Sequence, residues 1–198
     1  MQQTTPAILL GTQRCGEHSL ILHAYTQVNG RTNYLVYGIG GKHSKHPPFA
    51  PMSLMELTAD IRPTKDLPTL KESHLLYVPQ QLDTDIRRQT VAMFIAEVLF
   101  RTLRYPMQDN GMFEMLTQVM YEIDTADDIA NVHIRFLVRF ASQLGLTINK
   151  EEYPDLLNTP TSRTNRQALL SALCNYYHTH LEDWQEPKSL EVLREVFD

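Results

Sequence analysis

The sequence has only two cysteines, Cys15 and Cys174, and they form no Cys-x-x-Cys pair. This scarcity argues against a disulfide framework and against a structural zinc site, and it is typical of proteins in a reducing compartment. The sequence also lacks any run of about 18 apolar residues, the length that a helix needs to cross a bilayer. Its first residues lack the basic start and the long apolar stretch of a signal peptide. We therefore expect a cytoplasmic protein with no membrane partner.

Positive charge is also scarce, with 18 Lys and Arg residues against 23 Asp and Glu residues and a formal net charge of -5. Residues 1–79 nevertheless contain seven Lys and Arg against five Asp and Glu, whereas residues 80–198 contain eleven against eighteen. Five of the eight histidines and six of the eight glycines also lie in the first part. This change in composition predicts two domains of different class, at residues 1–79 and 80–198.

Residues 1–79 have the pattern of short β-strands with no helix between them. The turn pair Asn29-Gly30 between two apolar stretches is typical of a β-hairpin. Tyr34 and Tyr37 should face opposite sides of their strand, so at least one of them belongs to the core. The five strand-like stretches are AILLGT, HSLILHAYTQ, RTNYLVYGIG, MSLMELTADI and PTLKESHLLYV. Five short strands favour a closed barrel of the OB type, and an SH3-like barrel is the alternative that their spacing leaves open.

Residues 80–198 have the spacing of apolar residues that is typical of α-helices. The pattern predicts an all-α domain after the barrel, and therefore an α+β fold in two parts. The acidic stretch DTADD, residues 124–128, is interpreted as a helix N-terminus, where carboxylates offset the helix dipole. The expected helices cover residues 84–105 before Pro106, a second one capped by Asp109 or Asn110, a third from about residue 127 to a C-cap at Gly145, a fourth over residues 163–184, and a short closing helix capped by Ser189.

One stretch, LVYGIGGKHSKH at residues 35–46, combines a strand-like run with glycines and basic residues. It lacks the G-x-x-x-x-G-K-[ST] spacing of a nucleotide-binding loop, and prolines follow it in place of a helix. His43 and His46 could ligate a metal, but no carboxylate or cysteine lies close to them in the sequence. We interpret the stretch as a barrel strand that leads into a basic connection.

No arrangement of residues supports an enzyme. A nucleophile needs a base within reach and a third group that orients the base. Cys15 and His18 are neighbours in the sequence, but a structural role in a turn is the better interpretation. We therefore expect no catalytic residues, no metal and no cofactor.

The order and spacing of several segments resemble the bacterial recombination mediator family RecO, nearest to its form in Bacteroidetes. The resemblance covers essentially the whole chain. Its β-rich segments are GEHSLILHAYT, YLVYGIGGKHSK, PMSLMELTADIRP and LPTLKESHLLY, and its helical segments are DIRRQTVAMFIAEVLFRTLR and KSLEVLREVF.

The resemblance implies an N-terminal OB fold followed by a helical domain. It also implies a DNA repair function: binding of single- and double-stranded DNA, annealing of complementary strands, and loading of the RecA recombinase together with RecR. Such proteins also bind the acidic, Phe-ended tail of single-stranded DNA-binding protein, and the expected location is the cytoplasm in association with the nucleoid.

The sequence departs from this family in two respects. Many relatives carry a cysteine-based zinc site in the helical domain, but no cysteine lies between Cys15 and Cys174. We therefore predict that this chain binds no zinc. The segment between Gly145 and the fourth expected helix is also shorter than the family pattern.

An OB barrel binds single strands through a basic groove and aromatic side chains on which bases stack. The candidates for contacts with DNA are Lys42, Lys45, Arg31, Arg14, His43 and Tyr37. The candidates for contacts with an acidic peptide are Arg135 with Arg139, and Arg101 with Arg104, although placement at a helix C-terminus and i,i+4 pairing are the simpler explanation of these arginines. A net charge of +2 on residues 1–79 predicts modest, salt-dependent affinity for DNA. The alternative function is an OB-fold scaffold for protein interactions with little DNA affinity.

Overall fold

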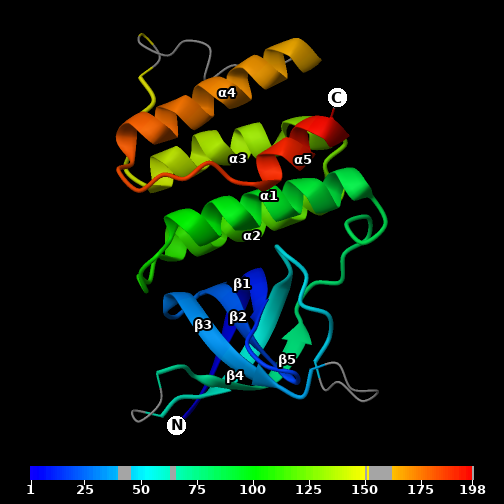
Figure 1. Cartoon of the computed structure of the whole chain (residues 1–198), viewed down its shortest axis with the longest axis vertical. Helices are drawn as coiled ribbons and strands as arrows, with labels where there is room; N and C mark the ends of the chain where they lie inside the picture. Colours follow the sequence, from blue (N-terminus) through cyan, green and yellow to red (C-terminus); the bar gives the residue numbers. More distant parts are fainter. Residues whose placement is uncertain (40–45, 63–65, 150, 152–161, 198) are drawn as a thin grey trace. The chain divides into compact units, whose positions relative to one another are not determined.

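The computed structural model describes residues 1–39, 46–62, 66–149, 151 and 162–197. The chain divides into two compact units, each built from two stretches of sequence. The barrel unit comprises Met1–Pro79 and Leu103–Met120, and the helical unit comprises Gln80–Thr102 and Tyr121–Asp198. Figure 1 labels the strands and helices of both units.

The barrel unit is built on five strands that close on themselves in the order β1-β2-β3-β5-β4. All neighbouring strands are antiparallel except β3 and β5, which are parallel. This arrangement confirms the prediction of a five-stranded OB-type barrel. The strands are β1 Gln2–Arg14, β2 Ser19–Thr26, β3 Gly30–Tyr37, β4 Leu54–Asp60 and β5 Thr69–Leu75.

Strand β1 closes the barrel because it pairs along its length with two different neighbours. Its first half pairs with β4, from Gln2 opposite Asp60, and its second half pairs with β2, up to Arg14 opposite Leu20. The register shifts between Leu9 and Gly11. Irregularities of this kind bend a strand and increase its twist, so that one strand can serve two sides of a barrel.

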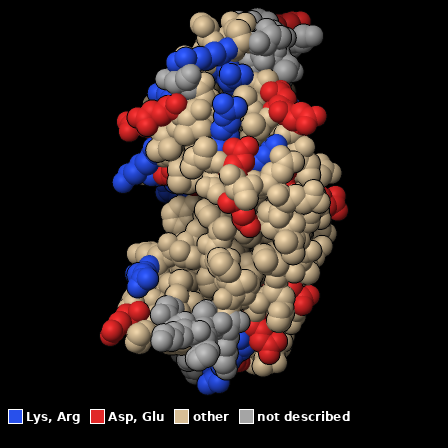
Figure 2. All heavy atoms as spheres, turned by 90° about the vertical axis from the view of Figure 1, so that its right-hand side faces the viewer, with Lys and Arg blue, Asp and Glu red and all other residues tan. Residues whose placement is uncertain are grey.

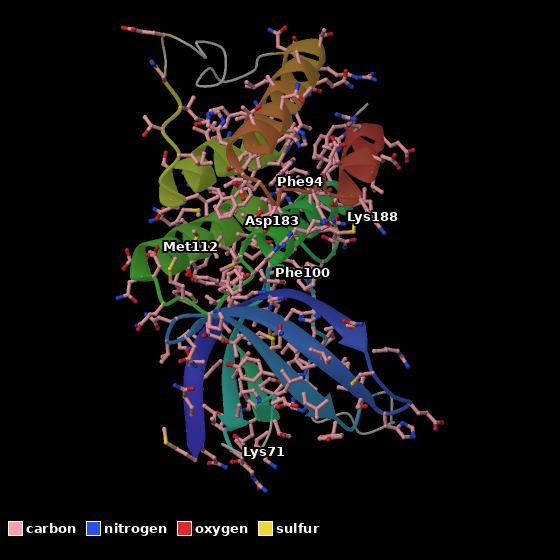
Figure 3. All side chains as sticks on the ribbon, turned by 60° about the vertical axis from the view of Figure 1, so that its left-hand side comes forward. Lys71, Phe94, Phe100, Met112, Asp183 and Lys188 are labelled. Atoms are coloured by element: carbon pink, nitrogen blue, oxygen red, sulfur yellow. The ribbon has the colours of Figure 1, made fainter. Side chains whose placement is uncertain are left out.

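The alternation of side chains along the strands separates the core from the surface. Tyr34 and Val36 on β3 point into the barrel, whereas Tyr37 is exposed. This outcome confirms that one of the two tyrosines belongs to the core. In Figure 3 side chains fill the interior of the barrel. The buried cluster consists of Ala7, Leu9, Leu20, Leu22, Ala24, Tyr34, Val36, Met55, Leu57, Ala59 and Leu70.

The described part of the chain contains five helices of eight or more residues. In the helical unit α1 packs against α3 and α5, and α3 packs against α4. Helix α2 begins in the barrel unit and ends in the helical unit. None of the described helices is long and apolar enough to cross a membrane. The helices are α1 Ile86–Thr102, α2 Asn110–Thr125, α3 Ile129–Gln143, α4 Arg163–His180 and α5 Ser189–Val196.

The N-cap of α2 agrees with the sequence, whereas the glycine predicted as the C-cap of α3 lies one residue beyond the observed C-cap, Leu144. The side chain of Asp109 accepts a hydrogen bond of 3.0 Å from the backbone N–H of Met112, as a cap of α2 should. After α3 the chain reaches Gly145, whose φ of +75° suits a glycine beyond a helix C-terminus.

The fourth helix ends earlier than the sequence predicted. It stops at His180, and Leu181 has the extended dihedral angles φ -121° and ψ 112°. Trp184 therefore lies beyond the helix. Its ring stacks on Tyr177 with the two ring centroids 4.7 Å apart, so the apolar spacing that suggested a longer helix reflects packing of the following turn.

The interpretation of DTADD as a helix N-terminus is wrong for its first two residues, which end α2. Asp124 lies in the last turn of α2 and is fully buried. Its carboxylate accepts backbone hydrogen bonds from Gln80, Gln81 and Leu82, at 2.8 to 3.1 Å. The carboxylate thus holds the chain segment before α1 against the end of α2.

The N-cap of α5 also differs from the prediction, because Lys188 and not Ser189 occupies it. Both the backbone N–H and the hydroxyl of Ser189 donate to the carboxylate of Glu97 on α1, at 2.9 and 2.6 Å. Burial alone would raise the pKa of Glu97, but hydrogen bonds from Ser189, Lys188 and Arg101 outweigh it and lower this pKa. A carboxylate from another helix therefore caps α5.

Candidate nucleic-acid interface

The outer face of strands β2 and β3 is the surface that OB folds commonly use to bind nucleic acid. Leu20, Leu22, Tyr34 and Val36 point into the barrel, so the alternate residues point outward. Four cross-strand pairs form this β2–β3 outer face: Ser19 with Tyr37, Ile21 with Leu35, His23 with Asn33, and Tyr25 with Arg31. From Arg31 to Tyr37 the face is about 20 Å long at a rise of about 3.3 Å per residue.

A polar cluster occupies the half of this face nearer the β2–β3 hairpin. The guanidinium of Arg31 donates to Asn33 Oδ1 at 2.8 Å, and His23 Nδ1 lies 2.8 Å from the same oxygen. Because Asn33 Oδ1 can only accept, the ring proton of His23 is on Nδ1. Burial lowers the pKa of His23, and it also lowers the pKa of Arg31 to about 10. At neutral pH the cluster therefore combines a neutral imidazole with a charged guanidinium.

Residues 103–109, which connect α1 to α2, lie against this hairpin. Tyr25 donates from its hydroxyl to the backbone oxygen of Met107 at 3.4 Å. Gly30, with a φ of +64°, approaches the same backbone so closely that a Cβ atom would collide with the Met107 oxygen. Burial, followed by the charge of Asp109, raises the pKa of Tyr25 to about 12. The connection is thus part of the same unit as the barrel.

The sequence-predicted DNA contacts fall at different places on the barrel. Tyr37 is 56% exposed at one end of the β2–β3 outer face, whereas Arg31 is only 8% exposed at the other end. Arg14 is exposed and lies opposite Leu20, so it leaves the sheet on the side that faces away from Tyr37. Lys42, His43 and Lys45 lie outside the described residues.

On the face that Figure 2 shows, the described residues form no single dominant basic patch. There the Lys, Arg, Asp and Glu side chains of the helical unit are intermixed, and much of the barrel surface is uncharged. Lys71 on β5 is exposed on the outside of the barrel and is labelled in Figure 3. On this face the electrostatic attraction of the barrel for a phosphate backbone is therefore modest.

Arg135, Arg139 and Arg101, all predicted to bind an acidic peptide, take part in internal ion pairs. Arg139 forms a two-pronged pair with Glu122 at 2.7 and 2.9 Å, and Arg135 lies 3.3 Å from Asp128. Arg101 pairs with Glu97 at 2.7 Å. Arg104 is exposed and belongs to the barrel unit, so it does not share a compact unit with Arg101.

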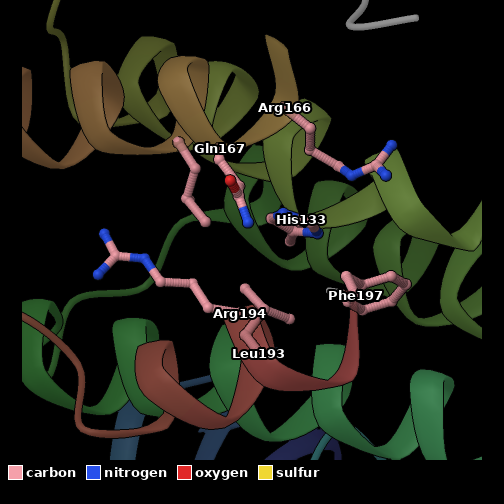
Figure 4. Close-up of a pocket in the computed structure, with 7 residues that line it drawn as sticks. His133, Arg166, Gln167, Leu193, Arg194 and Phe197 are labelled. Carbon is pink, nitrogen blue, oxygen red and sulfur yellow. The ribbon is translucent and has the colours of Figure 1, made fainter. Parts of the chain in front are cut away.

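A small basic pocket lies where α3, α4 and α5 of the helical unit meet (Figure 4). It is a small, shallow hollow with a volume of about 20 Å³, partly open to solvent. Arg166 and Arg194 lie at its sides, and within the described residues neither has a carboxylate partner at ion-pair distance. Each makes one long hydrogen bond of 3.4 Å, Arg166 to Asn131 and Arg194 to Ser171. The other lining residues are His133, Gln167, Leu170, Leu193 and Phe197.

His133 gives this pocket an unusual buried polar group. Its side chain is 1% exposed, and Nδ1 makes no hydrogen bond within the described part of the chain. Burial first, and then the charges of Arg166 and Arg135, lower the pKa of His133 to about 3. A neutral imidazole with an unused nitrogen therefore lines a pocket flanked by two arginines.

The described residues contain no group of three or more His, Cys, Asp or Glu side chains that could hold a metal ion. His46, considered above as a ligand, lies with Nδ1 2.8 Å from the hydroxyl of Ser73. Cys15 is exposed with its thiol 3.5 Å from the hydroxyl of Ser19, and Cys174 is buried.

Several residues of these sites were not identified from the sequence. Arg166 and Arg194 are 28 positions apart, on two different helices, and the sequence does not indicate that these helices pack together. No local pattern therefore links the two arginines to His133. The sequence analysis extended the first helix to Tyr105. Pro106 could have corrected this, because the residue before a proline favours an extended backbone over a helical one.

Comparisons with known proteins agree with this architecture. The family described as "Recombination protein O N terminal" matches residues 1–78, and "Recombination protein O C terminal" matches residues 83–152. The chain is 31% identical over 240 residues to "DNA repair protein RecO" of Phocaeicola vulgatus, and the match covers 100% of both chains. It is 30% identical over 242 residues to the protein of the same name from Bacteroides fragilis, again over 100% of both chains. The corresponding protein of Flavobacterium psychrophilum is 28% identical over 237 residues, with the same coverage. The chain therefore belongs to the RecO family of DNA repair proteins.

Proposed function

We propose that this chain is a mediator of homologous recombination that binds single- and double-stranded DNA and anneals complementary strands. The observation that carries the proposal is the closed OB-type barrel in a member of a DNA repair family. OB barrels bind single strands by combining cations with aromatic side chains. In this proposal an OB domain at residues 1–79 binds the DNA, and a helical domain at residues 80–198 binds protein partners. Those partners are RecR and the tail of single-stranded DNA-binding protein, and the complex loads RecA in the cytoplasm at the nucleoid.

The test is a titration of a fluorescently labelled single-stranded oligonucleotide, followed by anisotropy at several salt concentrations. We expect binding at low salt, with log K falling by about 0.7 per neutralised phosphate for each unit of log salt. Replacing Lys42 and Lys45 with alanine should make this slope shallower by about 1.4 if both contact phosphates. Alanine at Arg87 and Lys188, two exposed cations of the helical unit, is the matched control.

The outcomes separate the proposal from its alternative. If the wild-type chain shows no binding at low salt, or binding that salt does not change, the OB barrel is a scaffold for protein interactions. If the lysine variant and the control keep the same slope as the wild type, DNA binding stands but the basic loop is not its contact.

Among the residues that the structure describes, the basic pocket is the location that best suits the acidic, Phe-ended tail of single-stranded DNA-binding protein. The half-buried Phe197, backed by the buried Leu170 and Leu193, offers an apolar contact for the terminal aromatic side chain. Arg166 and Arg194 can bind carboxylates, and charge-assisted hydrogen bonds of this kind stabilise a complex more than neutral ones. The arginine pairs suggested by the sequence fit less well, because Glu122, Asp128 and Glu97 already neutralise Arg139, Arg135 and Arg101.

A synthetic acidic peptide that ends in Phe tests this location by calorimetry. Alanine at Arg166 or at Arg194 should weaken peptide binding about 10-fold or more, as expected for loss of a charged hydrogen bond of about 1.5–3 kcal/mol. Alanine at Arg139 is the matched control and should leave the affinity within about 2-fold. Loss of binding in the Arg139 variant, with normal binding in the other two, would move the peptide to the outer surface of α3.

A further inference from the structure

The connection at residues 103–109 carries the most exposed aromatic side chain among the described residues. Tyr105 is 80% exposed and Met107 is 67% exposed. The structure shows no hydrogen bond or ring contact of Tyr105 with the described part of the chain. Pro106 follows directly and limits the flexibility of this tyrosine's backbone. A large aromatic ring is thus held in solvent by a restrained segment.

This connection is fixed to the barrel and not only to the helices that it joins. The backbone of Met107 contacts Gly30 in the β2–β3 turn and accepts a hydrogen bond from Tyr25. Tyr25 is itself 3% exposed and belongs to the β2–β3 outer face. Tyr105, two residues before Met107, is therefore carried at the hairpin end of this face.

An exposed tyrosine consequently stands at each end of the β2–β3 outer face. Tyr37 lies at one end, and at the other Tyr105 lies two residues before Met107, whose backbone contacts Tyr25 and Gly30. Half-buried Ile21 and Leu35 and the polar His23–Asn33 pair lie between the two ends. This is not a contiguous apolar patch, which is the usual mark of a protein docking surface. Separate aromatic rings at the two ends of a track of about 20 Å suit two bases that are several nucleotides apart on one strand, since one OB fold contacts about 4–16 nucleotides.

We propose that Tyr105 is a base-stacking residue for single-stranded nucleic acid, contributed to the barrel's binding face by the segment between α1 and α2. Arg104, its exposed neighbour, places positive charge beside the stacked base. The inference rests on the proposed DNA binding and adds a contact from outside residues 1–79. Base stacking needs only an aromatic plane, so the contribution of Tyr105 does not depend on the base sequence.

Binding of a labelled oligothymidine strand by the Tyr105→Ala and Tyr105→Phe variants tests the proposal. The alanine variant should bind roughly 5- to 100-fold more weakly, the range measured for single stacking residues, whereas the phenylalanine variant should bind within about 2-fold of wild type. The matched control is Tyr121→Ala, which removes an exposed tyrosine from the helical unit and should leave binding unchanged. A second strand with the same phosphates but abasic sugars separates stacking from charge. On that strand the Tyr105→Ala variant and the wild type should bind equally.

Each result has a defined meaning. Wild-type binding together with normal binding by Tyr105→Ala overturns the stacking role and leaves the proposed function intact. An equal loss on the normal and the abasic strand also overturns it, because the residue then acts through the backbone or through folding. If the wild type binds neither strand, the proposed DNA binding fails and this inference fails with it.

Discussion

Replacing Asp124 with alanine should lower the free energy of unfolding of the helical unit by about 3–5 kcal/mol. The carboxylate is fully buried and is the acceptor for the backbone N–H groups of Gln80, Gln81 and Leu82. Alanine removes all of these bonds and leaves the buried N–H of Leu82 and the part-buried N–H groups of Gln80 and Gln81 without this acceptor. The loss therefore includes the cost of leaving those donors unsatisfied as well as the lost attraction to a charge.

Urea denaturation followed by the fluorescence of Trp184, which lies in the helical unit, measures this change. The Asp124→Asn variant should lie between the wild type and alanine, because it keeps one acceptor oxygen but turns an amide donor toward N–H groups. Asp127→Ala is the matched control, since Asp127 is exposed three residues later and should change stability by less than about 0.5 kcal/mol. A loss below about 1 kcal/mol for Asp124→Ala would show that water replaces the carboxylate and that the segment before α1 is not held by it.

Replacing Gly30 with alanine should destabilise the barrel unit by about 2–5 kcal/mol. Gly30 has a φ of +64°, which an L-residue adopts at a cost of about 1–2 kcal/mol. A Cβ atom would also collide with the Met107 oxygen and lie 2.6 Å from its carbonyl carbon. To remove this collision the backbone must move on both sides of the contact. Overpacking of this kind adds about 1–3 kcal/mol to the loss of stability.

Gly38→Ala separates these two contributions. Gly38 has a similar φ of +78°, but a Cβ atom there meets nothing within 4 Å. It should therefore show only the conformational cost of about 1–2 kcal/mol. Amide hydrogen exchange of β2 and β3 locates the effect, and faster exchange should appear at the hairpin in the Gly30 variant alone. Equal losses in both variants would show that the segment carrying Met107 yields without cost.

Local patterns predicted the barrel well. The pair Asn29-Gly30 marked the hairpin, and β2 and β3 flank a turn at residues 27–29, after which Gly30 supplies the positive φ. The alternation of Tyr34 and Tyr37 separated core from surface because side chains along a strand alternate with period two. Similarly, Asp109 was recognised as a cap because its bond reaches only three residues along the chain.

The errors and omissions arise from contacts between distant residues. Asp124 resembled a residue at a helix start, but its partners lie more than 40 positions earlier in the chain. Ser189 was assigned as a cap from its residue type, whereas Glu97 of another helix binds it. The basic pocket depends on three helices meeting around His133, and no spacing within one helix encodes that meeting.

The same holds for the candidate nucleic-acid interface. Sequence reasoning identified Tyr37, which the structure exposes, and also Arg31, which the fold buries beside Asn33. It did not identify Tyr105, because the contact between Gly30 and Met107 joins residues 77 positions apart. Residue type suggests which side chains can bind DNA, but only the tertiary fold determines which of them reach one face.

The alternation of the chain between its two units has a consequence for its synthesis. Because Leu103–Met120 belongs to the barrel unit, that unit lacks part of its structure until residue 120 has left the ribosome. By then α1, which belongs to the helical unit, has already been made. Domains that are contiguous in sequence can fold one after the other as they emerge. Here α1 interrupts the sequence of the barrel unit, so the β2–β3 hairpin lacks its contact with Met107 until that residue has been synthesised. Forming the contact between Gly30 and Met107 then closes a loop of more than 70 residues.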